Sequence, residues 1–386
     1  MKKLLFIAVF AILSLSANAQ WIQTSLDSNT VFVLVAKGDT IFAGTILNGV
    51  DVSFNNGRSW VAANSGLTNL EIWSLAISGN NIFAGTADGV FLSTNNGSSW
   101  TEADAGLLDL GVQALIAYNG YIYASSDGVF KSANNGASWT NANGGGYISG
   151  APINAFLISG GFLFAATNHG IWVTSGNGNQ WTFCGLSDTI GVNRLAISGG
   201  NIFAGTDICG VYLSSDNGNS WTQVNTGLVN LEIFSLAVKG NQTFAASRMH
   251  GVYLSTNNGS SWDAWNNGLP YPPLVQSLAI NGDTIFAGIS GEGVWKTSVL
   301  QMNGIAEIKN KESNISVYPN PATDNLTIES LQSAVIEITN IQGQAIQQQQ
   351  IKQGKTDVDI SGLAKGVYIL RLCSNGKTAM TKIVKE

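Results

Sequence analysis

The chain has 386 residues, enough for two or three domains, and a formal net charge of −6. Charged residues make up only 11%, while glycine is abundant at 45 and proline scarce at 6, a composition that favours short strands joined by tight turns and argues against a disordered chain. Residues 20–300 hold seven basic and sixteen acidic side chains, so no nucleic-acid partner is expected.

The first 19 residues have the pattern of a signal peptide. Lys2 and Lys3 supply a positive start, residues 4–15 form an apolar run too short to span a bilayer, and residues 17–19 (ANA) match an A-x-A cleavage site. No later apolar run reaches 18 residues, so we expect no transmembrane segment. The leader predicts export from the cytoplasm.

An octamer that ends in tryptophan recurs six times between residues 53 and 262. STNNGSSW stands at 93–100 and again at 255–262, with near copies before and between them. The tryptophans follow one another at intervals of 40, 39, 42, 40 and 41 residues: Trp60, Trp100, Trp139, Trp181, Trp221 and Trp262. A period near 40 residues with alternating β-branched and aromatic residues is typical of the blades of a β-propeller.

A second landmark, IFAGT or a close variant, occurs seven times, from 41–45 to 285–289, and predicts an all-β, seven-bladed propeller of four-stranded blades over residues 20–298. Asn-Asn-Gly in the octamer supplies the positive-φ positions of a tight turn, and the tryptophan is expected to cover its own hairpin. The last unit lacks the octamer. Residues 21–24, however, match the segment that starts at the tryptophan of each octamer, as in residues 221–224. We therefore predict that residues 21–27 pair with 292–298 and close the ring.

The octamer pattern S/T-x-N/D-x-G-x-x-W resembles the Asp box of the BNR-repeat families. These include sialidases, sortilin-type propellers, xyloglucanases and photosystem II assembly-factor-like propellers. The resemblance covers residues 53–262 and implies the fold, not one activity. In those families the box is a structural hairpin away from the active site, so the six tryptophans are expected to be structural.

A second module follows a linker at residues 299–314. Alternating runs between 315 and 386 predict a small immunoglobulin-like β-sandwich. Four segments resemble the type A sorting domain of the type IX secretion system: VYPNPATDNLTI, ITNIQGQ, ISGLAKGVYILRL and KIVKE. The resemblance implies that the secretion machinery reads residues 315–386, and that the protein is secreted or held at the cell surface.

Seven residues head the innermost strands and should surround the mouth of the central channel: Phe32, Trp73, Gln113, Asn154, Asn193, Phe234 and Gln276. Glu71 and Glu232 precede two of them in matching E-I-[WF]-S-L-A contexts. Aromatic, amide and carboxylate groups suit a sugar or peptide site, and long connections such as 141–154 often carry binding residues. The candidate ligand-binding residues are Trp73, Phe234, Glu71, Glu232, Tyr147 and Arg194. The alternative, that aromatic residues at strand starts only pack between blades, stays open.

Neither a metal nor a cofactor is expected. His169, Cys209 and His250 occupy equivalent turns, but neighbouring blades pack about 10 Å apart, whereas the ligands of one zinc ion lie within about 4 Å of each other. Cys184 and Cys209 are expected on one face of neighbouring blades, and export would permit a disulfide between them. This pairing is a hypothesis.

The sequence favours a non-catalytic module that binds glycan or protein over an enzyme. The resemblance to sialidases implies three arginines around the substrate, but Arg58 lies inside a box on the opposite face. A two-carboxylate mechanism needs only two of the sixteen acids, so a carbohydrate-active glycoside hydrolase is the alternative. A scaffold for other exported proteins is a third possibility.

Overall fold

The computed structural model describes residues 20–144, 148, 151–299, 315–330, 333–340, 345–374 and 377–386. The predicted leader, most of the predicted linker and Tyr147 lie outside these ranges. The chain divides into two compact units, Met1–Gln301 and Met302–Glu386, and each is described by itself.

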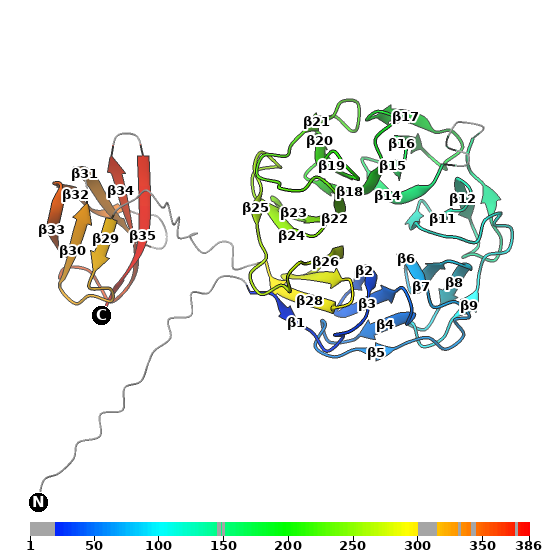
Figure 1. Ribbon diagram of the computed structural model, residues 1–386, viewed down its shortest axis with the longest axis horizontal. Coiled ribbons are helices and arrows are strands. Elements are labelled where there is room, and N and C mark those ends of the chain that lie inside the picture. The colour runs from blue at the N-terminus through cyan, green and yellow to red at the C-terminus, as the bar shows by residue number, and fades with distance from the viewer. Residues whose placement is uncertain are drawn as a thin grey trace, which may run out of the picture. The chain divides into compact units, whose positions relative to one another are not determined.

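The described residues of the first unit form seven four-stranded antiparallel sheets, arranged as the blades of a ring (Figure 1). The innermost strands are β2 (Val31–Lys37), β6 (Ile72–Ser78), β10 (Leu115–Tyr118), β14 (Ile153–Ser159), β18 (Val192–Ser198), β22 (Ile233–Lys239) and β26 (Val275–Asn281). The second strands are β3 (Thr40–Thr45), β7 (Asn81–Thr86), β11 (Tyr121–Ser125), β15 (Phe162–Thr167), β19 (Asn201–Thr206), β23 (Gln242–Ser247) and β27 (Thr284–Ile289).

The third strands are β4 (Val50–Ser53), β8 (Gly89–Ser93), β12 (Val129–Ser132), β16 (Gly170–Ser175), β20 (Val211–Ser214), β24 (Gly251–Ser255) and β28 (Gly293–Ser298). The outer strands are β5 (Val61–Ala62), β9 (Thr101–Glu102), β13 (Thr140–Asn141), β17 (Thr182–Gly185), β21 (Thr222–Gln223), β25 (Asp263–Ala264) and, for the seventh blade, β1 (Ile22–Gln23). The predicted seven blades, numbered here in the order of their innermost strands, are confirmed.

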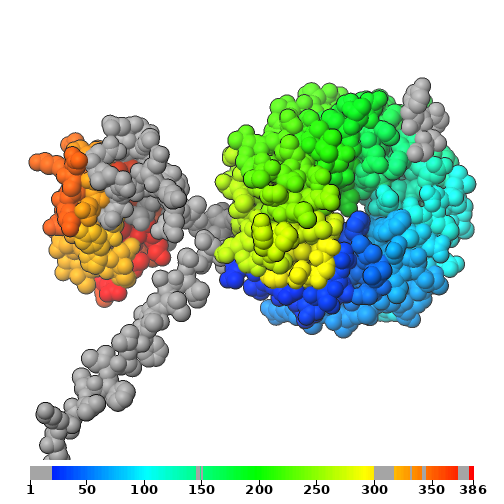
Figure 2. All heavy atoms as spheres, viewed as in Figure 1, coloured from blue at the N-terminus to red at the C-terminus, as the bar shows by residue number. Residues whose placement is uncertain are grey.

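The second strands carry the core of the ring. Phe42, Phe203 and Phe286, each from an IFAG segment, are fully buried. Side chains fill the joints between neighbouring blades, so the ring is closed in the space-filling view (Figure 2). A side chain on box residue Gly57 would begin 2.6 Å from Phe286 of the seventh blade, so glycine is required there both for its positive φ and for the close approach of the blades.

Five of the six boxes close their turns with their own polar side chains, as the second blade shows, whereas the fourth box has Gly176 in place of the asparagine or aspartate. Ser93 Oγ accepts a hydrogen bond from the Gly97 amide at 2.8 Å, and Asn95 Oδ1 accepts one from the Ser99 amide at 2.9 Å. Asn96 and Gly97 have φ of 56° and 86°. The predicted positive-φ turn is therefore confirmed.

The box tryptophans also bind the preceding blade, a contact that the sequence did not predict. Trp100 Nε1 donates to the Ala63 carbonyl at 2.7 Å, and Trp139 Nε1 donates to the Ala103 carbonyl at the same distance. Trp181, Trp221 and Trp262 make the same kind of bond to the preceding blade. Most outer strands have only two residues, too few to cover an indole ring, whereas the joint supplies both apolar contacts and a carbonyl acceptor.

The N-terminal segment closes the ring as predicted. In β1, Ile22 pairs with Lys296 and Gln23 with Trp295 of β28. Trp21 is 1% exposed, and its Nε1 donates to the Trp265 carbonyl at 2.8 Å. Trp21 therefore occupies the place of the seventh box tryptophan, and the last blade has no bare edge.

The second unit is a small β-sandwich, as predicted. Its first sheet runs in the order β29 (Ile315–Tyr318), β30 (Asn325–Ser330) and β33 (Gly354–Asp359). Its second sheet consists of β31 (Ala334–Thr339), β32 (Ala345–Ile351), β34 (Gly366–Ser374) and β35 (Lys377–Lys385), in the order β32-β31-β34-β35. A shared core includes Leu326, Ile336 and Leu370. Asn320 donates to the Lys382 carbonyl and accepts from the Val384 amide, which fastens the PNPATD segment to the last strand.

Within the described ranges, no helix is long and apolar enough to cross a membrane.

Candidate binding face and channel

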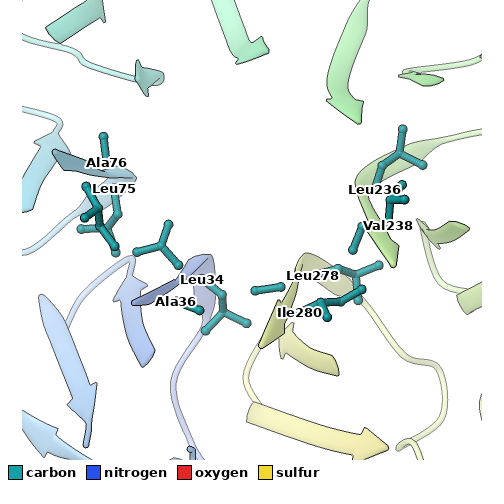
Figure 3. A pocket seen from close by; sticks show the side chains of 12 residues that line it. Leu34, Ala36, Leu75, Ala76, Leu236, Val238, Leu278 and Ile280 are labelled. Atoms are coloured by element: carbon teal, nitrogen blue, oxygen red, sulfur yellow. The ribbon is translucent and has the colours of Figure 1, made fainter. Parts of the chain in front are cut away.

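Among the innermost strands that surround the central channel, four give it an apolar side-chain lining. Innermost strands of neighbouring blades contact one another around the ring, from β2 to β26 and back to β2. Four of them, from the sixth, seventh, first and second blades, line a cavity of about 480 Å³, and Figure 3 shows the lining side chains around the open centre. The lining residues are Leu34, Val35, Ala36, Leu75, Ala76, Ile77, Leu236, Ala237, Val238, Leu278, Ala279 and Ile280. None of these side chains can transfer a proton or bind a metal.

Six of the seven predicted channel-mouth residues lie at β-bulges. In β6, for example, the pairing with β7 jumps from Ile72 to Ser74, and Trp73 is left as the extra residue. The same break occurs at Phe32, Asn154, Asn193, Phe234 and Gln276. In the third blade, Gln113 precedes β10. A bulge re-aims its side chain, which explains why this position departs from the regular alternation of the strand in six blades.

The two asparagines of this ring tie blades together. Asn154 Nδ2 donates to the Val192 carbonyl and Asn193 Nδ2 to the Ile233 carbonyl, each at 3.0 Å and each in the next blade. Arg194 Nη1 in turn donates to the carbonyls of Asn154 and Asn193 at 2.8 and 2.9 Å. Burial lowers the pKa of the Arg194 guanidinium. These bonds hold the bulges in place, and a ligand role for Arg194 stays a prediction.

The aromatic residues of the ring are half-buried at the joints. A Cβ on Gly111 would lie 3.2 Å from the Trp73 ring, so this indole rests on the connection to the third blade. Phe234 has the matching place in the sixth blade. Packing between blades therefore accounts for part of each ring, and the rest remains accessible. Their predicted ligand contacts stay a prediction.

Glu71 and Glu232 occupy matching places in the second and sixth blades but have different surroundings. Arg248 Nη1 lies 3.1 Å from Glu232 Oε2, while the residue that matches Arg248 in the second blade is Ala87. Two blades separate these glutamates on one side of the ring and three on the other. The two glutamates therefore do not form a pair. Tyr147, another candidate ligand-binding residue, lies outside the described residues.

The turns between second and third strands and the connections between blades lie on one side of the ring, here called the connection face. The boxes and the turns between first and second strands form the opposite box face. Turn and connection are bonded to each other, as in the hydrogen bond from the Gly89 amide to the Leu110 carbonyl at 2.6 Å. Among the described residues, eight exposed large apolar side chains belong to the connection face: Leu47, Leu70, Leu108, Leu110, Ile208, Val229, Met249 and Tyr271.

The connection face is also acidic. Ten carboxylates belong to its described residues: Asp27, Glu71, Asp88, Asp104, Asp109, Asp127, Asp188, Asp207, Glu232 and Glu292. Of the propeller's seven basic residues, only Arg194 and Arg248 lie on this side. Sequence spacing alone did not identify this face, because these side chains come from turns and connections of different blades.

Cys184 and Cys209 are both free thiols, so the disulfide hypothesis is wrong. Cys184 lies in a joint beside box residue Gly218, whereas Cys209 lies in the turn between β19 and β20. Successive turns of an antiparallel sheet lie at opposite ends, which separates the two sulfurs. Burial raises the pKa of the Cys184 thiol to about 12. The described residues contain no cluster of three or more His, Cys, Asp or Glu side chains that could hold a metal.

Seven closed blades define the first unit as a seven-bladed β-propeller, here followed by a small β-sandwich. Residues 316–386 match the family described as the secretion system C-terminal sorting domain. The predicted sorting domain is thereby confirmed, and it implies export through the type IX secretion system to the surface or the medium. No curated protein matches the chain.

Solved structures resemble the chain in fold at low sequence identity. PorZ, a bacterial surface component of the type IX secretion system of Porphyromonas gingivalis, is 15% identical with a TM-score of 0.59, over 93% of this chain and 59% of PorZ. YCF48 bound to a D1 peptide is 13% identical with a TM-score of 0.61, over 73% of this chain and 97% of YCF48. The GH74 xyloglucanase from Xanthomonas campestris is 12% identical with a TM-score of 0.59, over 81% of this chain and 59% of the enzyme.

Proposed function

We propose that this protein is an exported propeller that binds glycan or protein at the cell surface, without catalysis, through its connection face. The supporting observation is the concentration of exposed apolar side chains and carboxylates on that face. Single exposed apolar residues are ordinary, but a gathering of them on one face marks a contact surface. The other exposed large apolar side chains among the described residues of the propeller are spread over a box, the box-face ends of inner strands and the outer strands: Ile22, Phe54, Val61, Ile158, Phe162, Phe183 and Ile197.

The proposed route has two stages. Residues 1–19 act as a cleaved signal peptide to the periplasm, and residues 315–386 are then read by the type IX machinery at the outer membrane. The propeller occupies residues 20–298, and residues 299–314 are the linker. The similarity in fold to PorZ, a surface component of that secretion system, supports a surface location.

The second candidate function is glycoside hydrolysis, which the fold of the GH74 xyloglucanase favours. Two-carboxylate hydrolysis requires carboxyl groups about 5–9 Å apart. The matching Glu71 and Glu232 lie across the ring from each other, and Arg248 neutralises Glu232. This arrangement supports binding over hydrolysis, and so does the peptide-bound YCF48 of similar fold.

The experiment is a binding and turnover screen of residues 20–386 on immobilised polysaccharides and polypeptides. We expect saturable binding to at least one class and no release of reducing sugar. The connection-face variant Leu108→Thr should weaken the binding, whereas the matched box-face variant Phe54→Thr should not. Turnover that is abolished by Glu71→Gln would establish the hydrolase instead, and binding that only Phe54→Thr weakens would disprove the assignment of the face.

A further inference from the structure

We infer that the joint of the second and third blades is a docking site for a cationic polypeptide segment, one that carries lysine or arginine beside an apolar residue. This inference rests on the proposed function and names its partner. The site, here called the blade 2–3 patch, consists of Glu71, Trp73, Asp88, Leu108, Asp109 and Leu110.

Backbone hydrogen bonds make this patch continuous along the connection face. The Ala87 amide donates to the Glu71 carbonyl, and the Gly89 amide donates to the Leu110 carbonyl, so Asp88 lies between Glu71 and Leu110. Gly111 connects the Trp73 end of the patch to Asp109. A Cβ atom added at Gly111 would lie 3.2 Å from the Trp73 ring and 3.5 Å from Asp109 Oδ1. One backbone surface thus carries two leucines, an indole and three carboxylates.

The leucine at position 108 is not required by the fold. Leu108 is 73% exposed and Leu110 is 40% exposed. The connection between the first and second blades has the same GLxxLxx pattern and carries Thr68 where this one carries Leu108. An exposed leucine at a position that accepts threonine gains free energy only when a partner covers it.

The negative charges of the patch are likewise not needed for folding. Asp109 Oδ1 accepts from the Gly111 amide at 3.0 Å, and in the matching turns Asn69 and Asn230 accept the same bond without a charge. Glu71 faces Ala87 where its counterpart Glu232 faces Arg248. The propeller therefore leaves uncompensated negative charge at this joint.

Among the described residues beside the patch, no lysine or arginine neutralises its carboxylates. Lys131 is the single basic residue between positions 59 and 144, and its Nζ donates to the Asn177 carbonyl and to Asn179 Oδ1 at the box of the fourth blade, on the box face. The pKa of nearby Asp104 is raised by burial and by the charges of Glu102 and Asp88, as expected in a field of like charges.

The combination of groups selects the occupant. A second copy would bring the same acidic face and be repelled, and a phosphate-rich or anionic glycan polymer would be repelled in the same way. The hydroxyl groups of a neutral glycan can donate hydrogen bonds to the carboxylates, but they leave the negative charge uncompensated, which a cation does not. Lysine or arginine can pair with Glu71 and Asp109 and lie over the exposed part of the Trp73 ring, while an adjacent apolar side chain covers Leu108.

The experiment measures fluorescence anisotropy of labelled synthetic peptides with the chain of residues 20–386. The probes are a peptide of alternating lysine and leucine, one of lysine and serine, and one of glutamate and leucine. We expect the lysine–leucine peptide to bind and to weaken as salt rises, the lysine–serine peptide to bind about tenfold more weakly, and the glutamate–leucine peptide not to bind.

Variants of this chain test the location. Glu71→Gln with Asp109→Asn should weaken binding of the lysine–leucine peptide about tenfold, since asparagine keeps the turn bond that Asn69 makes. Asp39→Asn with Asp263→Asn, a control pair of exposed acids away from the connection face, makes the same change in charge and should change the affinity less than twofold. Unchanged melting temperatures will show that each variant folds.

Equal losses in the two sets of variants, or equal binding of all three peptides, would overturn the inference. If no peptide binds while the polysaccharide screen gives a ligand, this inference fails and the proposed function stands. If neither screen gives a ligand, both fail.

Discussion

Trp21 Nε1 donates a hydrogen bond to the Trp265 carbonyl at 2.8 Å, although 244 residues separate them. Their rings meet edge to face with centroids 5.3 Å apart, and Trp265 also covers Phe244 with centroids 5.1 Å apart. Where a box glycine faces a joint, as Gly97 faces Phe42, the position that matches Trp265 holds a smaller side chain: Ala63, Ala103, Ala142, Cys184 or Val224. The seventh blade has no box, and the indole of Trp265 fills the space that the missing hairpin leaves.

Replacing Trp21 should therefore destabilise the closure of the ring. We expect Trp21→Ala to lower the free energy of unfolding by about 3–5 kcal/mol, because it removes a fully buried indole. Trp21→Phe keeps an aromatic contact and loses the hydrogen bond, at a cost of about 1–3 kcal/mol for the orphaned carbonyl. Urea denaturation measures both values. Tyr271→Ala, which alters a side chain that is 94% exposed, serves as the control and should change the stability by less than about 0.5 kcal/mol. An equal effect of the two alanine variants would contradict the assigned closure.

Asp104→Asn should stabilise the protein at neutral pH. In the first, fifth and sixth blades, asparagine at this place accepts from the third strand and donates to the turn, as Asn64 does with the Val50 amide and the Asn48 carbonyl. A carboxylate cannot donate to the equivalent Asp88 carbonyl. We expect a gain of about 1 kcal/mol at pH 7 from the new bond.

The gain should depend on pH. Burial and the charges of Glu102 and Asp88 raise the pKa of Asp104 in the folded state above its ordinary 3.8, so the native protein favours the protonated form. The stability that this gives is complete below pH 3.8 and is lost as pH rises through the folded pKa. Chemical denaturation from pH 3.5 to 7 should therefore show the advantage of the asparagine variant growing with pH. A constant difference would indicate that the charge is irrelevant.

The substitution Asp51→Asn should also stabilise the protein at neutral pH, in this case because it removes a buried charge. Asp51 is 7% exposed, one of its carboxylate oxygens has no hydrogen-bond partner in the described structure, and desolvation raises its pKa. Its position in the third strand carries an aromatic residue in the other six blades: Phe91, Phe130, Trp172, Tyr212, Tyr253 and Trp295. Because an ionised buried carboxylate destabilises the fold, removal of the charge should raise the melting temperature at pH 7 by about 2–4 °C, and by less near pH 4. A lower melting temperature at pH 7 would contradict this.

The native thiols should react with alkylating agents at different rates. A raised pKa of about 12 leaves Cys184 protonated at pH 8.5, and its place in a joint restricts access. We expect iodoacetamide to modify Cys209 on the exposed turn well before Cys184, and urea to abolish the difference. Mass spectrometry without reductant gives the result directly, and two blocked thiols would restore the disulfide that the structure lacks.

Much of the candidate site could not be read from spacing. The ring of channel-mouth residues was predictable, because each heads an innermost strand, but the bulges that re-aim Trp73 and Asn193 depend on pairing with the second strand. The different settings of Glu71 and Glu232 also escaped prediction, since their contexts match in sequence and only the facing turn differs, with Ala87 in one blade and Arg248 in the other.

By itself the sequence determined the number of blades, the turn chemistry of each box, the closing strand and the sorting domain, because these depend on local patterns that repeat or on a short, distinctive C-terminal module. Only the tertiary structure decided that Trp100 binds Ala63 of the preceding blade, that Cys184 and Cys209 lie apart, and that carboxylates and leucines share one face. Those relationships join residues that are about one repeat apart in the sequence and meet at a joint between blades. The register of one blade against the next is set by side-chain packing at the joint, which no single repeat encodes.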